Sequence, residues 1–260
     1  MSAPLSKDAR QIAGMFDAIA PRYDFLNQWL SAGFDRRWRR RAIRSLALTG
    51  RDVLLDLCTG TADIALAARR GSARAHRIVG VDFSAAMLKI AHEKIDRAGE
   101  QDSIALLRGD ATQLPVRTAS VDALTVAFGV RNVDNPDAAC LEMLRVLRPG
   151  GRLAILEFAI PQMAAVRSVY LFYFTRVLPK LGGLVSHHST AYAYLPASVD
   201  AFRTPDEFAG LLKDVGFVDV AASRLTFGIV YLYNATKSRV ANPESRIPSP
   251  ESPNPSGSRL

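Results

Sequence analysis

Three acidic residues stand at or near the ends of three successive apolar stretches, and together they could bind a nucleoside. Asp56 lies in DVLLDL, Asp82 ends RIVGVD and Asp110 ends IALLRGD. An acid at the end of a buried strand can accept both hydrogen bonds of a ribose diol, which suits Asp82. Asp110 would then meet an adenine edge. Each acid alone could equally be a helix cap or a solvated carboxylate, but three at successive strand ends favour a ligand site.

The loop after the first stretch, DLCTGTAD (56–63), has the shape of a nucleotide-binding loop but contains a single glycine, Gly60. A dinucleotide fingerprint needs glycines in the pattern G-x-G-x-x-G, whereas Cys58 and Ala62 occupy positions where other glycines would be expected. Small residues still allow a ligand to approach the backbone, but the loop offers no cradle for a pyrophosphate. We therefore expect a ligand without phosphate. Cys58 is interpreted as a small residue in a tight turn rather than as a nucleophile.

These acids need a scaffold of parallel strands, and the sequence supplies one by alternating strands with helices. Strands are predicted at 52–57, 77–82, 104–110, 121–128 and 152–158, and helices at 62–69, 84–98 and 135–151. Ser84 is predicted to cap its helix. Near-continuous apolar strands interleaved with helices indicate a parallel sheet covered on both faces. The stretch 207–237 predicts a helix and two strands, which we expect to form an antiparallel hairpin at the sheet edge.

The totals fit one main domain with additions at either end. The chain has 260 residues, 48% of them hydrophobic, which is enough for a sizeable core, and a formal charge of +8. Residues 1–50 are expected to form a helical cap, 51–240 the α/β domain with an insertion at 160–203, and 241–260 a disordered tail rich in proline and serine. No signal peptide or membrane-spanning run is visible, and two distant cysteines favour a reducing compartment and no metal site. We expect a cytoplasmic protein.

The motifs resemble the Rossmann-like S-adenosylmethionine (SAM) methyltransferases. That resemblance rests on a strand followed by DLCTGTA, a strand ending in VD, a strand ending in GDA and a helix–LRPGG–strand unit. Longer stretches are similar to the menaquinone/ubiquinone biosynthesis C-methyltransferase family, namely FDAIAPRYDFLNQWLSAGFDRRWRR, FGVRNVDN, RVLRPGGRLAILEFA and YAYLPASVDAF. The resemblance covers roughly residues 12–237. It implies an α/β fold with a mostly parallel seven-stranded sheet, helices on both faces and an antiparallel edge hairpin.

The resemblance also implies SAM as the cofactor and a prenylated quinol as the substrate. Methylation of a ring carbon of demethylmenaquinol is the expected reaction, and a prenylated benzoquinol of ubiquinone biosynthesis is the alternative acceptor. The residues expected to bind SAM are Asp56, Gly60, Thr61, Asp82, Asp110 and Ala111.

A quinol ring carbon is weakly nucleophilic until a ring hydroxyl ionises, so a cation in a dry pocket would help. Arg131 in FGVRN is our candidate for that catalytic cation, and Asn132 could bond the other ring oxygen. The alternative is that Arg131 merely pairs with an acid such as Asp134. His187 or His188 could accept the proton. The tyrosines that could line the ring pocket are Tyr23, Tyr192 and Tyr194.

The stretch RRWRRRAIR (36–44) carries six arginines in nine residues. A nucleic-acid surface would interleave aromatic stacking platforms, and only Trp38 is present, so we expect no nucleic acid. The stretch is either a solvated helix face or a surface for an anionic membrane, where prenylated quinones reside. Peripheral contact with the cytoplasmic membrane face is therefore an option, and a homo-oligomer is left open. The aromatic stretch 166–178 either covers the isoprenoid entrance or forms a core helix.

Two other functions stay open at this point. One is an RNA-modifying methyltransferase that uses the basic stretch, and the other is a non-catalytic protein of the same fold that acts through an interface. Salt-sensitive RNA binding would support the first. Binding of SAM without turnover of any quinol would support the second.

Overall fold

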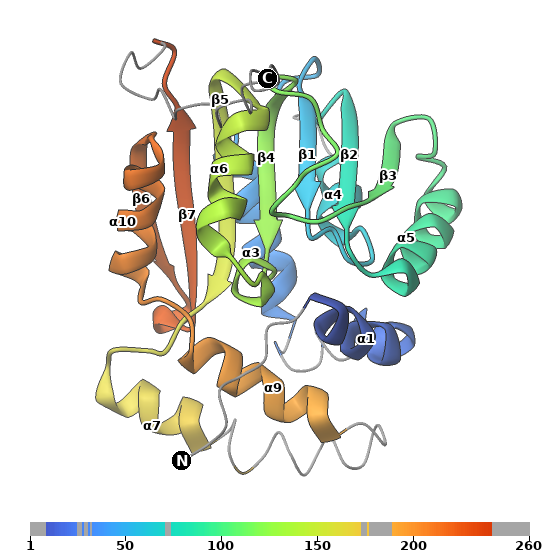
Figure 1. Cartoon of the computed structure of the whole chain (residues 1–260). Coiled ribbons are helices and arrows are strands. Elements are labelled where there is room, and N and C mark those ends of the chain that lie inside the picture. The colour runs from blue at the N-terminus through green and yellow to red at the C-terminus, as the bar shows by residue number, and fades with distance from the viewer. Residues whose placement is uncertain are drawn as a thin grey trace, which may run out of the picture.

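The computed structural model describes residues 9–24, 28, 31, 33–70, 74–172, 176 and 189–240. Its centre is a seven-stranded sheet of order β3-β2-β1-β4-β5-β7-β6 (Figure 1). The strands are β1 Val53–Leu57, β2 Arg77–Asp82, β3 Ile104–Arg108, β4 Val121–Ala127, β5 Leu147–Phe158, β6 Phe217–Leu225 and β7 Val230–Lys237. Pairing is parallel from β3 to β5, whereas β7 runs antiparallel to both β5 and β6. The predicted mostly parallel sheet with its antiparallel edge hairpin is confirmed.

The strand order places β1 between β2 and β4, which is where the winding of the sheet reverses. In the register, Asp56 of β1 lies opposite Gly80 of β2 and Thr125 of β4. Crossover connections therefore leave β1 and β4 toward opposite sides, and a crevice opens beyond the carboxyl ends of these two strands. The acids singled out in the sequence lie at or just beyond this edge.

Helices cover both faces of the sheet, as predicted. They are α1 Ala9–Ile19, α3 Phe34–Ser45, α4 Asp63–Ala68, α5 Ala85–Ala98, α6 Pro136–Val146, α7 Ala164–Phe172, α9 Ser189–Asp200 and α10 Pro205–Val215, with 3₁₀ turns η1 Ala20–Arg22, η2 Val130–Asn132 and η4 Thr226–Gly228. One core packs α6 and α10 against the sheet through Met143 and Phe208. The other packs α3, α4 and α5 against the opposite face through Trp38, Leu66 and Ile95.

The largest error in the predicted element boundaries lies where the third predicted helix meets the strand after it, which begins at Leu147 and not at 152. The helix predicted at 135–151 ends at Val146, and Leu147 already has the extended backbone of β5 (φ −67°, ψ 139°). Pro149 explains the early end, because a proline disfavours the helical conformation of the residue before it. The predicted start of α5 is correct, since the Ser84 hydroxyl accepts a hydrogen bond from the amide of Met87 and caps this helix.

The carboxyl ends of the parallel strands are covered by elements from outside the sheet. Figure 1 shows α1, α7 and α9 gathered at that end of the molecule. Among the helices within the described ranges, none is both long and apolar enough to cross a membrane. The tail predicted to be disordered, 241–260, lies outside the described residues, so that expectation stays a prediction.

Candidate functional site

The turn that follows β1 keeps a glycine-like backbone although it contains one glycine. Cys58, Gly60 and Ala62 have φ angles of 54°, 55° and 66°, in the left-handed region that favours glycine. We call residues 58–62 the β1 loop. Its curvature points the amide of Gly60 at Asp82, whose Oδ2 accepts the hydrogen bond at 2.8 Å. Cys58 and Ala62 therefore adopt the left-handed backbone conformation expected of glycines, although neither residue is a glycine.

Asp56 of β1 supports the β1 loop through hydrogen bonds of its side chain. Its side chain is buried, with a relative exposure of 1%, and its two oxygens accept hydrogen bonds from the hydroxyls of Thr59 (2.6 Å) and Thr125 (2.8 Å). Burial raises the pKa of this carboxyl to about 6, although both hydroxyls act in the opposite direction. Asp56 is not among the described residues that line the cavity. The geometry gives it a part in shaping the loop.

Asp82, Asp110 and Ala111 do face the cavity at the strand ends. Asp82 accepts hydrogen bonds from the backbone amides of Gly60 (2.8 Å) and Ser84 (2.9 Å), and burial raises its pKa. The Oδ1 atom of Asp110 accepts two hydrogen bonds from Thr112, both at 2.8 Å. Backbone contacts thus hold both carboxylates in place.

The cavity between these acids has a volume of about 600 Å³, a size suited to a small-molecule ligand. Residues from the β1 loop, the ends of β2 and β4, α1 and the segment after η2 line it. The polar and charged side chains on its wall include Asp82, Asp110 and Asp134, and among the described residues that line it there is neither lysine nor arginine. The site is therefore acidic, and its charge suits a cationic ligand that carries no phosphate.

Residues 9–24, which we call the cap segment, close one side of this cavity. Phe16 and Tyr23 contribute their rings to the wall, where they pack edge to face with centroids 6.0 Å apart. Tyr23 was one of the tyrosines expected in the pocket. Thr61 donates its hydroxyl hydrogen bond to Asp24 of the cap segment at 2.5 Å and is not among the described residues that line the cavity, so its expected role in binding the cofactor stays a prediction.

Arg131 and Asn132 lie in η2, after the end of β4, and they occupy different environments. Asn132 lines the cavity, whereas the Arg131 side chain is 7% exposed and forms an ion pair of 2.6 Å with Glu157 of β5. Its guanidinium also donates to the carbonyl of Phe128 at 2.7 Å. The alternative partner considered from the sequence, Asp134, is not the one found. The catalytic role of Arg131 stays a prediction, and its immediate partner is an acid from the neighbouring strand.

The remaining candidates differ in whether the structure describes them. Tyr194 donates its hydroxyl hydrogen bond to the side-chain oxygen of Asn132 at 3.1 Å, and burial raises the Tyr194 pKa. Within the range expected either to cover the isoprenoid entrance or to form a core helix, α7 buries Tyr170 and exposes Val169 and Phe172, 69% and 62% of whose surfaces are accessible. His187 and His188, together with the side chain of Tyr192, lie outside the described part of the chain.

Sequence reasoning expected Tyr23 in the pocket but missed Phe16 and Glu157. Phe16 begins a stretch that carries the family resemblance but indicates no role for this ring, and Glu157 appears as one acid in an apolar strand. An acid in a buried strand was the available signal, because an ionised group at such a position requires a partner.

Comparison with known proteins places this geometry in a family. The profile of the ubiE/COQ5 methyltransferase family matches residues 5–237, most of the chain. A protein of Geobacter sp. (strain M21), named ubiquinone/menaquinone biosynthesis C-methyltransferase UbiE, is 42% identical over 233 residues, which cover 90% of this chain and 99% of that protein. A protein of Bacteroides fragilis (strain ATCC 25285), named demethylmenaquinone methyltransferase, is 40% identical over 231 residues, covering 89% of this chain and 94% of that protein.

A solved structure agrees with the fold. It is a SAM-dependent methyltransferase of Thermotoga maritima, described as a possible histamine N-methyltransferase, with a TM-score of 0.59 and 19% identity. The match covers 87% of this chain and all of that one (100%). At this identity the likeness supports the Rossmann-like arrangement of the sheet and says nothing about the substrate.

Proposed function

Because the chain belongs to the ubiE/COQ5 methyltransferase family, we propose that it methylates a ring carbon of demethylmenaquinol to give menaquinol, with SAM as the methyl donor. The observation that carries the proposal is the acidic cavity at the switch point of the sheet, in a chain at least 40% identical to relatives named for this chemistry. A prenylated benzoquinol is the alternative acceptor, because the Geobacter relative is named for both quinones.

The residues of the cavity fit SAM. Its sulfonium and ammonium groups are cationic and it carries no phosphate, which matches a wall with three aspartates (82, 110 and 134) and, among the described lining residues, no basic side chain. Asp82 would bind the ribose diol and Asp110 the adenine edge, with the backbone of Gly60 and Ala111 approaching the ligand closely. Asp56 and Thr61 would act indirectly, through hydrogen bonds that fix the conformation and position of the β1 loop. Bound there, SAM supplies an electrophilic methyl group that the quinol ring carbon takes up in exchange for its proton.

The chain's own contribution is to orient the quinol and favour its ionised form. Asn132, fixed by the Tyr194 hydroxyl, would hydrogen-bond one ring oxygen. Arg131 remains our candidate for the charge that favours the quinolate, and its ion pair with Glu157 determines how much of that charge reaches the cavity. In this scheme the ring hydroxyl gives its proton to water before methylation and the ring carbon gives up its own afterwards, since guanidinium is not a base at neutral pH. The oxygen then regains a proton to yield the methylated quinol, so one proton is released overall.

Peripheral contact with the anionic cytoplasmic face of a membrane is part of the proposal. Five arginines of α3 are exposed, namely Arg36, Arg37, Arg40, Arg41 and Arg44. The Trp38 indole of the same helix donates to the hydroxyl of Thr226 at 2.8 Å, which brings η4 beside α3, and Phe227 of η4 is 69% exposed. A cationic helix beside a protruding aromatic residue is a combination that favours an anionic lipid surface.

The proposed function is tested by supplying the purified protein with SAM and either demethylmenaquinol or a demethylated benzoquinol, both with short prenyl chains in detergent. We expect methylated menaquinol, detected by mass as the addition of one methyl group, and slower turnover of the benzoquinol. Cells that lack the protein should accumulate a quinone lighter by one methyl group. If SAM binds but neither quinol is methylated, the proposal is wrong.

A further inference from the structure

The cap segment is attached to the loops around the cofactor cavity by two carboxylates, Asp17 and Asp24, each directly after one of the segment's two aromatic residues that line this cavity. Asp17 accepts a hydrogen bond from the hydroxyl of Ser84 at 2.5 Å and another from the amide of Ala86 at 3.2 Å. Asp24 accepts the hydroxyl hydrogen bond of Thr61 at 2.5 Å. Each contact reaches a residue close in sequence to a proposed cofactor ligand, Asp82 or Gly60. The position of the cap segment is therefore coupled to the strand-end loops that shape the cavity.

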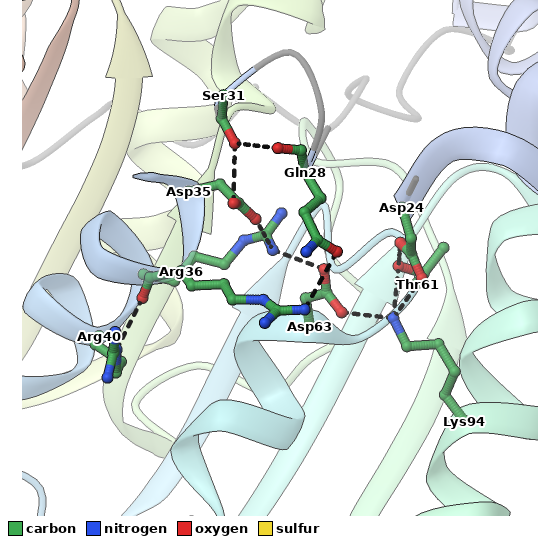
Figure 2. Close-up of polar contacts among 10 residues, drawn as sticks. Asp24, Gln28, Ser31, Asp35, Arg36, Arg40, Thr61, Asp63 and Lys94 are labelled. Carbon is green, nitrogen blue, oxygen red and sulfur yellow. Dashed lines mark hydrogen bonds and ion pairs between the residues drawn. The ribbon is translucent and has the colours of Figure 1, made fainter. Parts of the chain in front are cut away.

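A lysine of α5 completes the second attachment. Lys94 donates to Oδ2 of Asp24 at 2.7 Å and to the hydroxyl of Thr61 at 3.1 Å. The Lys94 side chain is only 18% exposed, so water screens its charge less than that of a typical surface lysine, whereas 39% of the Asp24 side chain is exposed. The contacts link the cap segment, the β1 loop and α5 at one point, as Figure 2 shows.

Asp63, the first residue of α4, joins the same group of charges. Its Oδ1 is 2.5 Å from the Lys94 ammonium and its Oδ2 is 2.6 Å from the Arg39 guanidinium. Burial alone would raise the pKa of Asp63, but Arg39 and Lys94 together lower it below its usual value. The carboxylate is thus ionised at neutral pH and holds the start of α4, directly after the β1 loop, between two cations.

Arg39 extends the contacts to the first turn of α3. It is 2.9 Å from Asp35, whose other oxygen accepts the Ser31 hydroxyl hydrogen bond at 2.9 Å. Arg39 therefore has two carboxylate partners, and its side chain is only 11% exposed. In this cluster, Lys94 is the cation that bonds both Asp24 and Asp63, so its removal would leave those two carboxylates facing each other without their common partner.

We propose that Asp24 and Lys94 are positioning residues of the cofactor site, which hold Tyr23 and the β1 loop together over the cavity. The inference rests on the proposed function, because it takes this cavity as the SAM site. Tyr23 is the link between the charges and the ligand, since it precedes Asp24, lines the cavity and lies 3.9 Å from the position a Cβ atom on Gly60 would occupy. Loss of the Asp24–Lys94 contact should therefore let the bound cofactor leave sooner.

The experiment compares the affinity and dissociation rate of S-adenosylhomocysteine in the full chain and in Asp24→Asn and Lys94→Met. We expect each substitution to raise the dissociation constant about tenfold or more, mostly through faster dissociation. The double variant should lose little more than Lys94→Met alone, because that substitution already removes the Asp24–Lys94 contact together with the contact to Asp63. With a soluble quinol, KM for SAM should rise by a similar factor while kcat changes less than threefold. Lys94→Arg, which keeps the charge, should recover most of the affinity.

Arg97→Met is the matched control, because Arg97 lies one turn further along α5 and pairs with Glu93 at 3.1 Å while 72% of its side chain is exposed. It should bind S-adenosylhomocysteine as the wild type does. Equal dissociation rates in wild type, Asp24→Asn and Lys94→Met would overturn the positioning role. Binding is measured without quinol, so failure of the wild type to bind S-adenosylhomocysteine would instead count against the proposed function itself. Thermal unfolding of each variant confirms that the compared proteins are folded.

Discussion

Arg131 and Glu157 form an ion pair of 2.6 Å in which the two side chains expose only 7% and 1% of their surfaces. The pair joins the turn after β4 to the end of β5, beside the cavity. Glu157 also accepts hydrogen bonds from the backbone amides of Arg131 (3.2 Å) and Phe158 (3.0 Å). Buried charges with this many partners hold the local geometry in place. Removing one of them leaves the other buried without its counter-charge, which destabilises the fold.

Arg131→Met should therefore lower the free energy of unfolding by about 3–5 kcal/mol, because Glu157 would stay buried without its partner. The double variant Arg131→Met/Glu157→Gln should recover most of this loss. Chemical denaturation measures both. Arg148→Met is the control, since the Arg148–Asp122 pair is partly exposed (46% and 23%) and should cost less than about 1 kcal/mol. Equal losses in the two single arginine variants would contradict the burial argument.

The same double variant separates folding from chemistry. If the Arg131 charge favours the quinolate, the folded double variant should bind SAM normally but turn over about 100- to 1000-fold more slowly, as when one oxyanion donor is removed. Its residual rate should rise with pH, because hydroxide then supplies the ionised quinol. A pH–rate profile on a reduced quinone provides the measurement. A wild-type rate would remove Arg131 from the mechanism and move attention to Asn132 and the Tyr194 that holds it.

A second prediction concerns Asp82, the residue proposed to bind the ribose of SAM. Asp82→Ala should weaken SAM binding by roughly 1.5–3 kcal/mol, the range for hydrogen bonds to a charged group, or about 10- to 150-fold in dissociation constant. Part of this effect would come through Gly60, whose amide loses its acceptor. Calorimetry measures the change, with Asp96→Ala, an exposed acid of α5, as the control. Unchanged SAM affinity, or binding of NAD in its place, would refute the assignment.

A third prediction follows from the buried carboxyl of Asp56, whose pKa burial raises from 3.8 to about 6. The folded chain then holds a proton that the unfolded chain has released between these pH values, so the stability this group contributes is present below about pH 4 and lost as pH rises through 6. Asp56→Asn keeps a neutral group that can still bond both threonine hydroxyls. Relative to wild type, it should gain on the order of 3 kcal/mol of unfolding free energy between pH 4 and 7.

Urea denaturation across that pH range measures the effect. Other groups titrate in both proteins and cancel in the difference, which leaves Asp56 as the source of any divergence. The exposed substitution Asp96→Asn should produce a curve parallel to wild type. Parallel curves for Asp56→Asn as well would mean that the carboxyl is ionised in the fold at a normal pKa.

Much of the fold was accessible from the sequence because it depends on local patterns. Apolar stretches separated by helices specify parallel strands, and the acids at their ends specify a common edge, so Asp82 and Asp110 were correctly expected to meet. The short link between β6 and β7 indicated their hairpin. In each case the physical cause lies within one element or in the order of elements.

The contacts that sequence reasoning missed join elements far apart in the chain. Lys94 resembles any polar residue of an amphipathic helix, and its partner Asp24 lies 70 residues away. The pairing of Arg131 with Glu157 depends on β4 and β5 being neighbours and on where each strand ends, which spacing alone does not determine. Similarly, Arg39 was indistinguishable in sequence from the exposed arginines around it, although its charge is engaged by Asp35 and Asp63.

The difference between Arg39 and the exposed arginines of α3 determines which residues to replace in a fourth prediction, which concerns the binding of α3 to an anionic membrane. Replacing the five exposed arginines by glutamine (Arg36, Arg37, Arg40, Arg41 and Arg44) should reduce binding to anionic vesicles by up to about 4000-fold, at roughly 1 kcal/mol per charge. Activity on a detergent-solubilised quinol should survive. A charge-matched control replaces five exposed arginines elsewhere, namely Arg51, Arg70, Arg77, Arg97 and Arg117. Vesicle sedimentation measures both, and equal losses would reduce the effect to net charge.

The last prediction concerns the close approach of Gly129 to Cys58 at the floor of the cavity. A Cβ atom on Gly129 would lie 2.4 Å from the Cβ and 2.7 Å from the sulfur of Cys58, closer than real contacts allow. Gly129→Ala should therefore displace the β1 loop, lower the unfolding free energy by about 1–3 kcal/mol and weaken SAM binding. Cys58→Gly removes both clashing atoms at a position whose φ of 54° suits glycine.

Cys58→Gly alone should keep SAM affinity and turnover, because burial raises the pKa of the Cys58 thiol and leaves little thiolate to act as a nucleophile. The double variant Cys58→Gly/Gly129→Ala should then recover most of what Gly129→Ala lost, since the added methyl group takes the space left by the cysteine side chain. Denaturation and calorimetry on the four proteins complete a double-mutant cycle. Loss of turnover in Cys58→Gly with SAM binding intact would give the thiol a chemical role, and additive losses would mean that Gly129 is required for a reason other than this contact.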